Sequence, residues 1–248
     1  MILVTNDDGI TAPGIRHLVG LMGRLGEVWV VAPDKMRSGM GHAITIGNIL
    51  TYQECAPQDG ATREFSCSGT PADCVKLAKN ELLDRTPDLC VSGINHGSNA
   101  SINVIYSGTM AAAIEGGIEG IPSIGFSLCS HDYAADMSAM DEYILRMSCQ
   151  ALEKGLPERT VLNVNFPCGE IKGVKVCRQA RTKWSQEFER RVTPYGEDYF
   201  WLTGHPITED DGADTDDRAL AESFASVVPV TFDLTAYGAI DGLEKWDF

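Results

Sequence analysis

The chain begins Met1-Ile-Leu-Val-Thr-Asn-Asp-Asp-Gly-Ile10, and this stretch decides the fold. Its apolar and β-branched residues, Ile2 to Thr5, form a short strand pattern that ends in the polar run Asn6-Asp7-Asp8-Gly9. A helix pattern follows at once, with Pro13 near its start. Its apolar positions have the i, i+3, i+4, i+7 spacing of one helix face: Ile15, Leu18, Val19 and Met22. The order of the two patterns predicts the first half of a strand–helix–strand unit.

The alternation of strand and helix patterns continues through residue 166. Further strands are predicted at 27–32, 89–92, 121–128 and 160–166, and helices at 70–84, from 107 onward and at 136–154. Residues 43–66 are expected to be extended, with a turn at 56–60. Strands separated by helix-length segments need crossover connections, which produce a parallel sheet with helices on both faces. We therefore predict an α/β fold with a Rossmann-like, three-layer, mostly parallel sheet.

The character of the sequence changes after about residue 180. Residues 184–204 are rich in aromatic side chains and contain a turn pattern at 195–199, which predicts a hairpin. The aromatic side chains of such a hairpin favour burial against another subunit. The alternative is that the hairpin packs on the core of its own chain. The acidic run 209–217 is interpreted as a solvated loop. We expect an α/β catalytic core over residues 1–180. Residues 181–248 are expected to form a hairpin and a C-terminal extension that make oligomer contacts. In one alternative, the last strand or helix of this extension packs on the core.

Composition excludes several classes of protein. The 248 residues are 44% hydrophobic and 22% charged, as in globular chains with a substantial core. The net charge of −15 argues against binding to nucleic acid polymers or to anionic membranes. No apolar run reaches membrane-spanning length, and the start lacks the pattern of a secretory signal. The eight scattered cysteines, without a CxxC motif, are interpreted as core residues of a cytoplasmic protein.

Polar loops that contain glycine follow several of the predicted strands. In an open parallel sheet, ligands bind beyond the carboxyl ends of the strands. Because these ends meet at one edge, we expect the loops to line one site. The loops are Asn6–Gly9, Asp34–His42, Ser92–Asn99 and Tyr106–Thr109.

Asp7 and Asp8 are adjacent carboxylates at a strand end, where two negative charges repel unless a cation lies beside them. Ligand sets made only of oxygen suit Mg²⁺, Mn²⁺ or Ca²⁺ rather than zinc. Ser38 and Asn95, from two other loops, would add neutral oxygens. The pattern favours a metal site, and the alternative is that the two aspartates cap the helix that starts near Pro13.

The tripeptide Ser-Gly-Thr occurs at two predicted helix starts, 68–70 and 107–109. Free backbone N–H groups, two hydroxyls and a glycine suit a phosphate group, and capping of the helix is the alternative for either copy. Thr70 and Asp73 have nearly the pattern of a capping box. Asn95 and Asn99 closely precede the second copy, so we favour 107–109 as the phosphate site.

The histidines indicate a role in catalysis less strongly than the aspartates and asparagines do. His42 and His96 lie in the candidate loops, and each is a candidate for orienting a catalytic group or for donating a proton to a leaving group. His17, within a predicted helix, is expected on the surface. No HExxH, GxSxG or P-loop motif is present, and residues 38–41 lack the third glycine of a dinucleotide fingerprint.

Taken together, these motifs resemble the SurE family (stationary-phase survival protein E). The resemblance is carried by Val4–Ile10, Pro13–Gly14, Val31–Asp34, Arg37–Gly39, Ser68–Val75, Pro87–Asp88, Ser92–Asn99 and Tyr106–Thr109. Further similarities lie at Asn163–Pro167, Trp201–Gly204 and Val227–Thr235, so the resemblance covers nearly the whole chain.

The resemblance implies a metal-dependent phosphatase that hydrolyses nucleoside 5′-monophosphates, with 3′-nucleotides and short polyphosphate as further substrates. It also implies a homodimer or homotetramer built by exchange of C-terminal elements. One divalent metal would be held by Asp7, Asp8, Ser38 and Asn95, and phosphate by Asn99, Ser107, Gly108 and Thr109. The residues expected to act in catalysis are Asp7, Asp8, Asn95 and Asn99.

Two mechanisms and two other functions stay open at this stage. The phosphate ester is attacked either by water that Asp8 orients or by an aspartate that forms an aspartyl-phosphate. A phospho-acceptor signalling domain also carries two acidic residues after its first strand. It needs a later Asp and Lys, and the loop Ser92–Asn99 has neither. Such a domain would be a non-catalytic metal-binding regulatory module. The other alternative is an inactive oligomeric binding protein, and an assay of phosphate release across nucleotides discriminates all three functions.

Overall fold

The computed structural model describes residues 1–210 and 212–247. Within them, the central sheet has nine strands in the order β3–β4–β2–β1–β5–β6–β7–β13–β8. The strands are β1 (Ile2–Thr5), β2 (Val28–Pro33), β3 (Tyr52–Cys55), β4 (Arg63–Cys67), β5 (Leu89–His96), β6 (Ser123–Leu128), β7 (Thr160–Phe166), β8 (Val174–Val176) and β13 (Ala225–Thr231). The run from β4 to β7 is parallel throughout. The predicted α/β fold with a mostly parallel sheet is confirmed.

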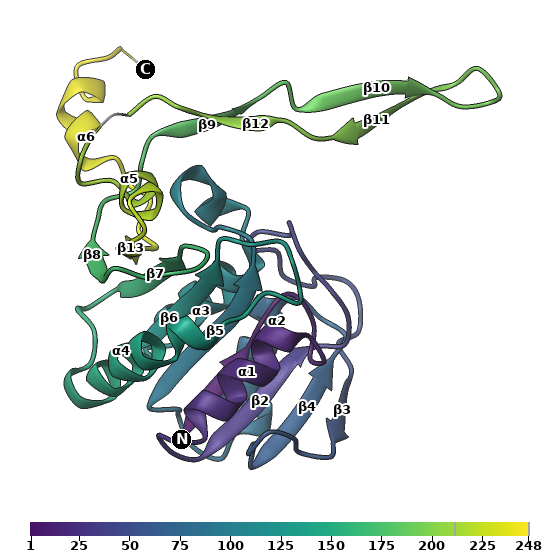
Figure 1. Cartoon of the computed structure of the whole chain (residues 1–248), viewed down its shortest axis with the longest axis vertical. Helices are drawn as coiled ribbons and strands as arrows, with labels where there is room; N and C mark the ends of the chain where they lie inside the picture. Colours follow the sequence, from purple (N-terminus) through teal and green to yellow (C-terminus); the bar gives the residue numbers. More distant parts are fainter. Residues whose placement is uncertain (211, 248) are drawn as a thin grey trace.

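Helices cover both faces of this sheet (Figure 1). The α-helices are α1 (Pro13–Met22), α2 (Pro71–Leu77), α3 (Gly108–Ile118), α4 (Asp141–Lys154), α5 (Asp216–Ala221) and α6 (Tyr237–Leu243). The π-helical turn η1 (Ala78–Leu82) continues α2, and η2 (Ser101–Ile105) and η3 (Ser138–Met140) are 3₁₀ turns. No helix among residues 1–210 and 212–247 is long and apolar enough to cross a membrane.

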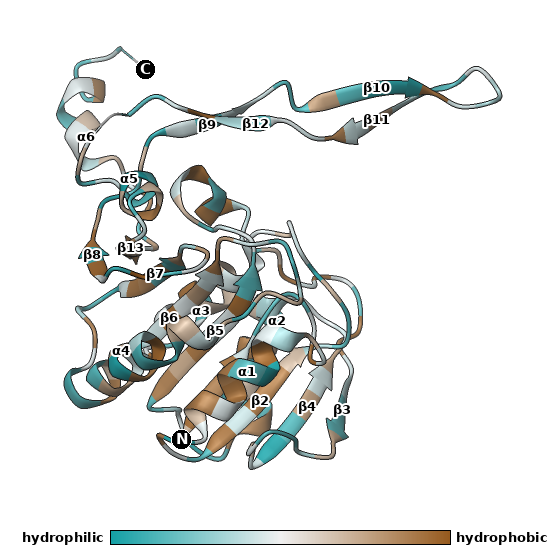
Figure 2. Ribbon diagram, viewed as in Figure 1, coloured by the Kyte–Doolittle hydropathy of each residue, from teal (hydrophilic) through white to brown (hydrophobic). Residues whose placement is uncertain are grey.

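Alternate residues of β1 serve opposite layers of the core. Ile2 and Val4 belong to one buried cluster with residues of α1 and α4, whereas Leu3 belongs to a second cluster with residues of α2 and α3. This follows from the period of two along a strand. All four residues of β1 are accordingly buried, and in Figure 2 the brown, hydrophobic segments lie in the inner strands, whereas the outer strands β3 and β4 are largely teal.

The order of the parallel strands reverses beside β1. The chain runs from β1 outward to β2 and β4, and then crosses to β5 on the other side of β1. The loops that leave β1 and β5 therefore diverge, and ligands of open α/β sheets bind in the crevice at such a point. Asn6–Gly9 and the loop after Asn95 lie there.

β5 extends further than predicted, to His96 instead of Ser92. Its register against β6 shifts between Ser92 and Asn95. Gly93 makes this possible, since its φ is +131° and a Cβ atom there would lie 2.3 Å from the carbonyl oxygen of Phe126. The irregularity sets the position of Asn95 at the edge of the sheet.

The segment after residue 180 forms a long arm and then returns to the sheet (Figure 1). β9 (Thr182–Ser185) pairs with β12 (His205–Thr208), and β10 (Phe188–Val192) pairs with β11 (Asp198–Leu202), all antiparallel. Beyond the arm, β13 lies antiparallel to β7 within the central sheet. The C-terminal part thus contributes both an arm and a core strand, and the division at residue 180 stays a prediction.

The prediction of a solvated loop at 209–217 is wrong for Asp210 and Asp216, whereas Glu209 and Asp214 are exposed as predicted. The Asp210 side chain is 4% exposed and pairs with Arg178, and Asp216 is wholly buried. Asp211 lies outside the described residues. These carboxylates are buried because N–H groups and a guanidinium from distant segments of the chain bind them. The local run of acidic residues does not reveal these distant partners.

Two further interpretations need correction. All eight cysteines lie in the described part and are free thiols, but only Cys67, Cys74, Cys90 and Cys177 are buried. Cys168 is exposed, so core packing explains only half of the set. His17 is half-buried rather than a surface residue, because its Nε2 lies 2.6 Å from Oδ1 of Asp141 and joins α1 to α4.

Candidate active site

Asp7 is buried at the carboxyl end of β1, with 3% of its surface exposed. Its Oδ1 accepts a hydrogen bond from the Thr109 hydroxyl at 2.6 Å, and its carbonyl oxygen accepts one from the Arg37 N–H at 2.7 Å. Burial raises the pKa of Asp7 to about 6, and the Asp8 charge adds to the rise while the Thr109 hydrogen bond opposes it. The ionised form of Asp7 is therefore costly in the protein alone.

Asp8 faces β5 and the loop after β6. Its Oδ2 lies 3.4 Å from the backbone nitrogen of His96 and 3.6 Å from Nδ1 of the same residue. Its Oδ1 accepts a hydrogen bond from the Tyr133 hydroxyl at 3.1 Å, and the rings of Tyr133 and His96 stack at 4.5 Å. Burial and the Asp8 charge raise the pKa of Tyr133 to about 12, so the hydroxyl stays a donor. Sequence reasoning missed Tyr133, which lies in a loop without a motif.

The other two predicted ligands come from neighbouring loops. Asn95 donates a hydrogen bond from Nδ2 to the Gly97 carbonyl at 2.7 Å, which leaves its Oδ1 as an acceptor. Ser38 is exposed and directly follows Arg37, whose N–H group binds Asp7. Its hydroxyl forms no hydrogen bond within the described part of the chain. The structure brings the segments of all four residues to one edge of the sheet.

The donor set fits a hard divalent cation. Among the described residues, no Lys or Arg forms an ion pair with Asp7 or Asp8, and no group of three or more His, Cys, Asp or Glu side chains is placed to hold a metal. Two carboxylates whose side chains are almost fully buried, with only the ring of His96 nearby and no Lys or Arg, lack a permanent compensating charge. Neutral oxygens from Ser38 and Asn95 would complete an oxygen shell of the type that Mg²⁺ or Mn²⁺ prefers.

The start of α3 packs directly on Asp7. Ser107 is the N-cap residue, and its Oγ accepts a hydrogen bond from the N–H of Met110 at 3.0 Å. A Cβ atom on Gly108 would lie 2.7 Å from Cβ of Asp7, so glycine permits this close approach. The backbone N–H of Thr109 faces the Asp7 carboxylate and lowers its pKa, whereas within the described residues the N–H of Gly108 has no hydrogen-bond acceptor. Free N–H groups at a helix start bind anions.

A buried amide network fixes Asn99. The N–H of Asn99 binds Oδ1 of Asn165, its carbonyl accepts from Nδ2 of Asn163, and its Nδ2 binds Oγ of Ser127, each at 2.8 Å. The side-chain nitrogen of Asn99 therefore points beneath the loop, not toward the carboxylates. Two asparagines alternating in the apolar strand β7 are the signal that sequence reasoning passed over.

His42 lies apart from the carboxylate pair. Its Nε2 lies 2.7 Å from the buried carboxylate of Glu115 on α3, which Lys76 also binds at 2.7 Å. Burial alone would raise the pKa of Glu115, but the hydrogen bonds from His42 and Lys76 outweigh it and lower the pKa. His42 therefore holds its loop against α3. Of the two histidines, only His96 lies beside the predicted metal ligands.

Comparison with known proteins places the chain in a family. The family model described as "Survival protein SurE" matches residues 2–186. Proteins named "5'-nucleotidase SurE" from Flavobacterium psychrophilum and Christiangramia forsetii are 57% and 58% identical to it, across 100% and 99% of this chain and 97% and 96% of theirs. The crystal structure of the Sure protein from Aquifex aeolicus matches with a TM-score of 0.85 and 35% identity over 98% of both chains. The chain is therefore a member of the SurE family.

Proposed function

We propose that the protein is a metal-dependent phosphomonoesterase that converts nucleoside 5′-monophosphates to nucleoside and phosphate. Its class, a 5′-nucleotidase, follows from full-length relatives that carry this name. The proposed metal dependence rests on one observation: Asp7 and Asp8 lie at the switch point of the sheet without a Lys or Arg partner among the described residues. A regulatory module without activity has no comparable support.

Asp7, Asp8, Ser38 and Asn95 are the residues that would hold the metal. A bound divalent cation would supply positive charge that polarises the phosphoryl group and activates water. Thr109 orients Asp7 through its 2.6 Å hydrogen bond, and Tyr133 orients Asp8 through its 3.1 Å hydrogen bond. These two hydroxyls keep the carboxylates in fixed positions.

The start of α3 is the proposed phosphate site. The N–H group of Gly108 at the first helical turn would bind a phosphoryl oxygen, aided by the helix dipole, while the Thr109 N–H faces the Asp7 carboxylate. Ser107 closes the turn by capping Met110. The amide network holds Asn99 and its loop in place, and Asn99 would contribute by fixing the position of this loop beside the helix start. Fixed donors of this kind stabilise charge as it spreads in the transition state.

Asp8 is proposed to orient the attacking water, and direct attack by Asp7 or Asp8 is the rival path. The two paths differ in the number of displacements at phosphorus. Direct attack by water is one displacement and inverts the configuration of a substrate made chiral at phosphorus. An aspartyl-phosphate is formed and hydrolysed in two displacements, so overall retention of configuration supports that path.

A substrate panel tests the proposal. The purified chain is assayed for phosphate release from 5′-monophosphates, 3′-monophosphates and short polyphosphate with Mg²⁺ or Mn²⁺. We expect hydrolysis of 5′-monophosphates, with slower release from the other two substrates. Absence of release from every nucleotide with either metal contradicts the proposed function.

The exposed aromatic residues of the arm support a homodimer or homotetramer as the proposed assembly. Phe188, Tyr195, Phe200 and Trp201 are each more than half exposed. We propose that the segment after residue 180 buries them against another copy. Light scattering tests this: Phe200→Ser is expected to yield smaller assemblies than the unmodified chain, and a monomer in both contradicts it.

The eight free thiols support a cytoplasmic location.

A further inference from the structure

Ser101 has an unusual backbone at the edge of the proposed site. Its φ is +57°, in the left-handed region that side chains other than glycine rarely adopt, and it is 4% exposed. It follows Asn99 by two residues and begins η2, which leads to Ser107 and the start of α3. A conformation of this kind persists only where surrounding contacts enforce it.

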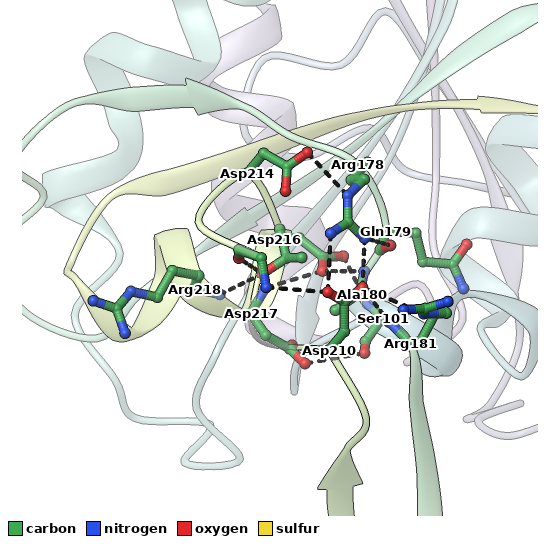
Figure 3. A network of polar contacts seen from close by, with 12 residues as sticks. Ser101, Arg178, Gln179, Ala180, Arg181, Asp210, Asp214, Asp216, Asp217 and Arg218 are labelled. Carbon is green, nitrogen blue, oxygen red and sulfur yellow. Dashed lines mark hydrogen bonds and ion pairs between the residues drawn. The ribbon is translucent and has the colours of Figure 1, made fainter.

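Asp216, from α5, supplies that contact (Figure 3). Its Oδ2 accepts a hydrogen bond from the N–H of Ser101 at 2.7 Å, and its Oδ1 accepts from the N–H groups of Ala180 and Asp217, both at 2.9 Å. Asp216 is wholly buried, and within the described residues it forms no ion pair. Three N–H donors satisfy this charge, so the carboxylate joins the loop after β5 to the base of the arm.

A second set of contacts joins the same two parts. The Ser101 hydroxyl lies 2.6 Å from Oγ1 of Thr182 and donates to Oδ2 of Asp217 at 3.2 Å. Thr182 also accepts from the N–H of Ile102 at 3.3 Å. Further along η2, Trp184 donates from Nε1 to Oδ1 of Asn103 at 2.9 Å. The segment between Asn99 and Ser107 is therefore held from the C-terminal side of the chain.

We propose that Asp216 is a positioning residue for the phosphate site, acting by holding Ser101 in its left-handed conformation and thereby placing Asn99 and η2. This inference rests on the proposed function of that site. It assigns a role in substrate binding to a carboxylate of the C-terminal segment that touches neither the substrate nor the proposed metal ligands.

Hydrogen exchange of the full-length chain tests the structural half of the inference. Asp216→Asn keeps one acceptor oxygen and replaces the other with a donor that opposes an N–H group. We expect backbone amides of residues 98–106 to exchange about tenfold faster in this variant. Asp214→Asn is the matched control, because its side chain is 67% exposed and, among residues 1–210 and 212–247, binds Arg178 alone. Equal exchange in both variants overturns the proposal.

Kinetics test the functional half. In Asp216→Asn, we expect the KM for a nucleoside 5′-monophosphate and the inhibition constant of inorganic phosphate to rise together by about tenfold. A purely structural role would lower the folded fraction and thus the apparent kcat, while both constants stayed as in Asp214→Asn. That second result contradicts the proposal.

A further variant covers the case in which Asp216→Asn does not fold. Thr182→Val removes the contacts to Ser101 and Ile102 with little change in shape, and we expect smaller rises in the same direction. If Asp216→Asn is unfolded and Thr182→Val leaves exchange and both constants unchanged, the proposal is wrong. If the unmodified chain hydrolyses no nucleotide, the proposed function fails, while the exchange result still decides whether Asp216 holds Ser101.

Discussion

The same tripeptide, Ser-Gly-Thr, begins two helices of this molecule and has a different register in each. At α2 the third residue, Thr70, is the N-cap, and it forms a reciprocal capping box with Asp73. At α3 the first residue, Ser107, is the N-cap, so glycine and threonine fall in the first helical turn. The position of the cap decides which groups remain available.

The difference shows that the residues around each Ser-Gly-Thr copy determine which role the copy has. In the first copy, Thr70 and Asp73 bind each other's N–H groups, and Thr45 donates to the same carboxylate. In the second copy, the threonine hydroxyl and backbone N–H face Asp7, and within the described residues the Gly108 N–H has no acceptor. The first copy serves a helix end, and the second serves the carboxylate pair. The following predictions test this contrast, from the largest expected effect to the smallest.

Asp8→Asn is expected to have the largest effect. The variant keeps an oxygen that accepts from Tyr133, so folding should be intact, but it removes one charge of the proposed metal site. We expect kcat for a nucleoside 5′-monophosphate to fall by at least about a hundredfold. Asp34→Asn, an exposed carboxylate on the neighbouring loop, serves as the control and should keep its activity. Equal kcat values for Asp8→Asn and Asp34→Asn would contradict the assignment of Asp8 to the metal site.

Asp7→Asn is expected to stabilise the protein when divalent metal is chelated. The pKa of Asp7 is about 6 in the folded protein against an ordinary value of 3.8, so folding favours its protonated form. Ionisation therefore lowers stability as pH rises from about 4 to 6, by at most about 3 kcal/mol above that range. Removing the charge should raise the free energy of unfolding at pH 7.5 but not at pH 4. Urea unfolding in EDTA measures this, and an equal gain at both pH values contradicts it.

Thr109→Val sharpens the contrast at the second copy. It removes the 2.6 Å hydrogen bond to Asp7, and a hydrogen bond to a charged group contributes about 1.5–3 kcal/mol. We expect a loss of about tenfold or more in kcat. The acidic limb of the pH–rate profile should also move to higher pH, because loss of this donor raises the pKa of Asp7 further. A pH–rate profile that does not move would mean that Thr109 serves only the structure of α3 and does not affect the ionisation of Asp7.

Thr70→Ala, at the first copy, is expected to have the smallest effect. Loss of the cap should lower the free energy of unfolding by about 1 kcal/mol. The kcat and KM should equal those of the unmodified chain, since Thr70 contacts Asp73 and the Ala43 carbonyl but neither Asp7 nor Asp8. Thermal unfolding and a kinetic assay measure the two quantities. A kcat lowered as much as in Thr109→Val would erase the distinction between the two copies.

The core of the fold follows from local sequence, and the site follows only in part. The strand and helix patterns from Ile2 to Phe166 predict the parallel sheet, because each depends on the spacing of its own apolar residues. The capping box at Thr70 is confirmed for the same reason. The extension of β5 to His96 was missed, since a polar, glycine-containing segment has no strand pattern.

Residues that act over long sequence distances were not predictable. Tyr133 reaches Asp8 across 125 positions and Asp216 reaches Ser101 across 115, and neither has a local signal. The buried asparagines of β7 were visible in the sequence, but only the fold shows that they bind Asn99. His42, close to the candidate ligands in sequence, is drawn away by the buried charge of Glu115.

The most direct test of the carboxylate pair as a metal site is phosphate release from AMP by the metal-stripped chain, measured before and after Mg²⁺ or Mn²⁺ is restored. We expect no turnover in excess EDTA and recovery of turnover when either ion is added in excess over the chelator. Full turnover while EDTA remains in excess would contradict the account.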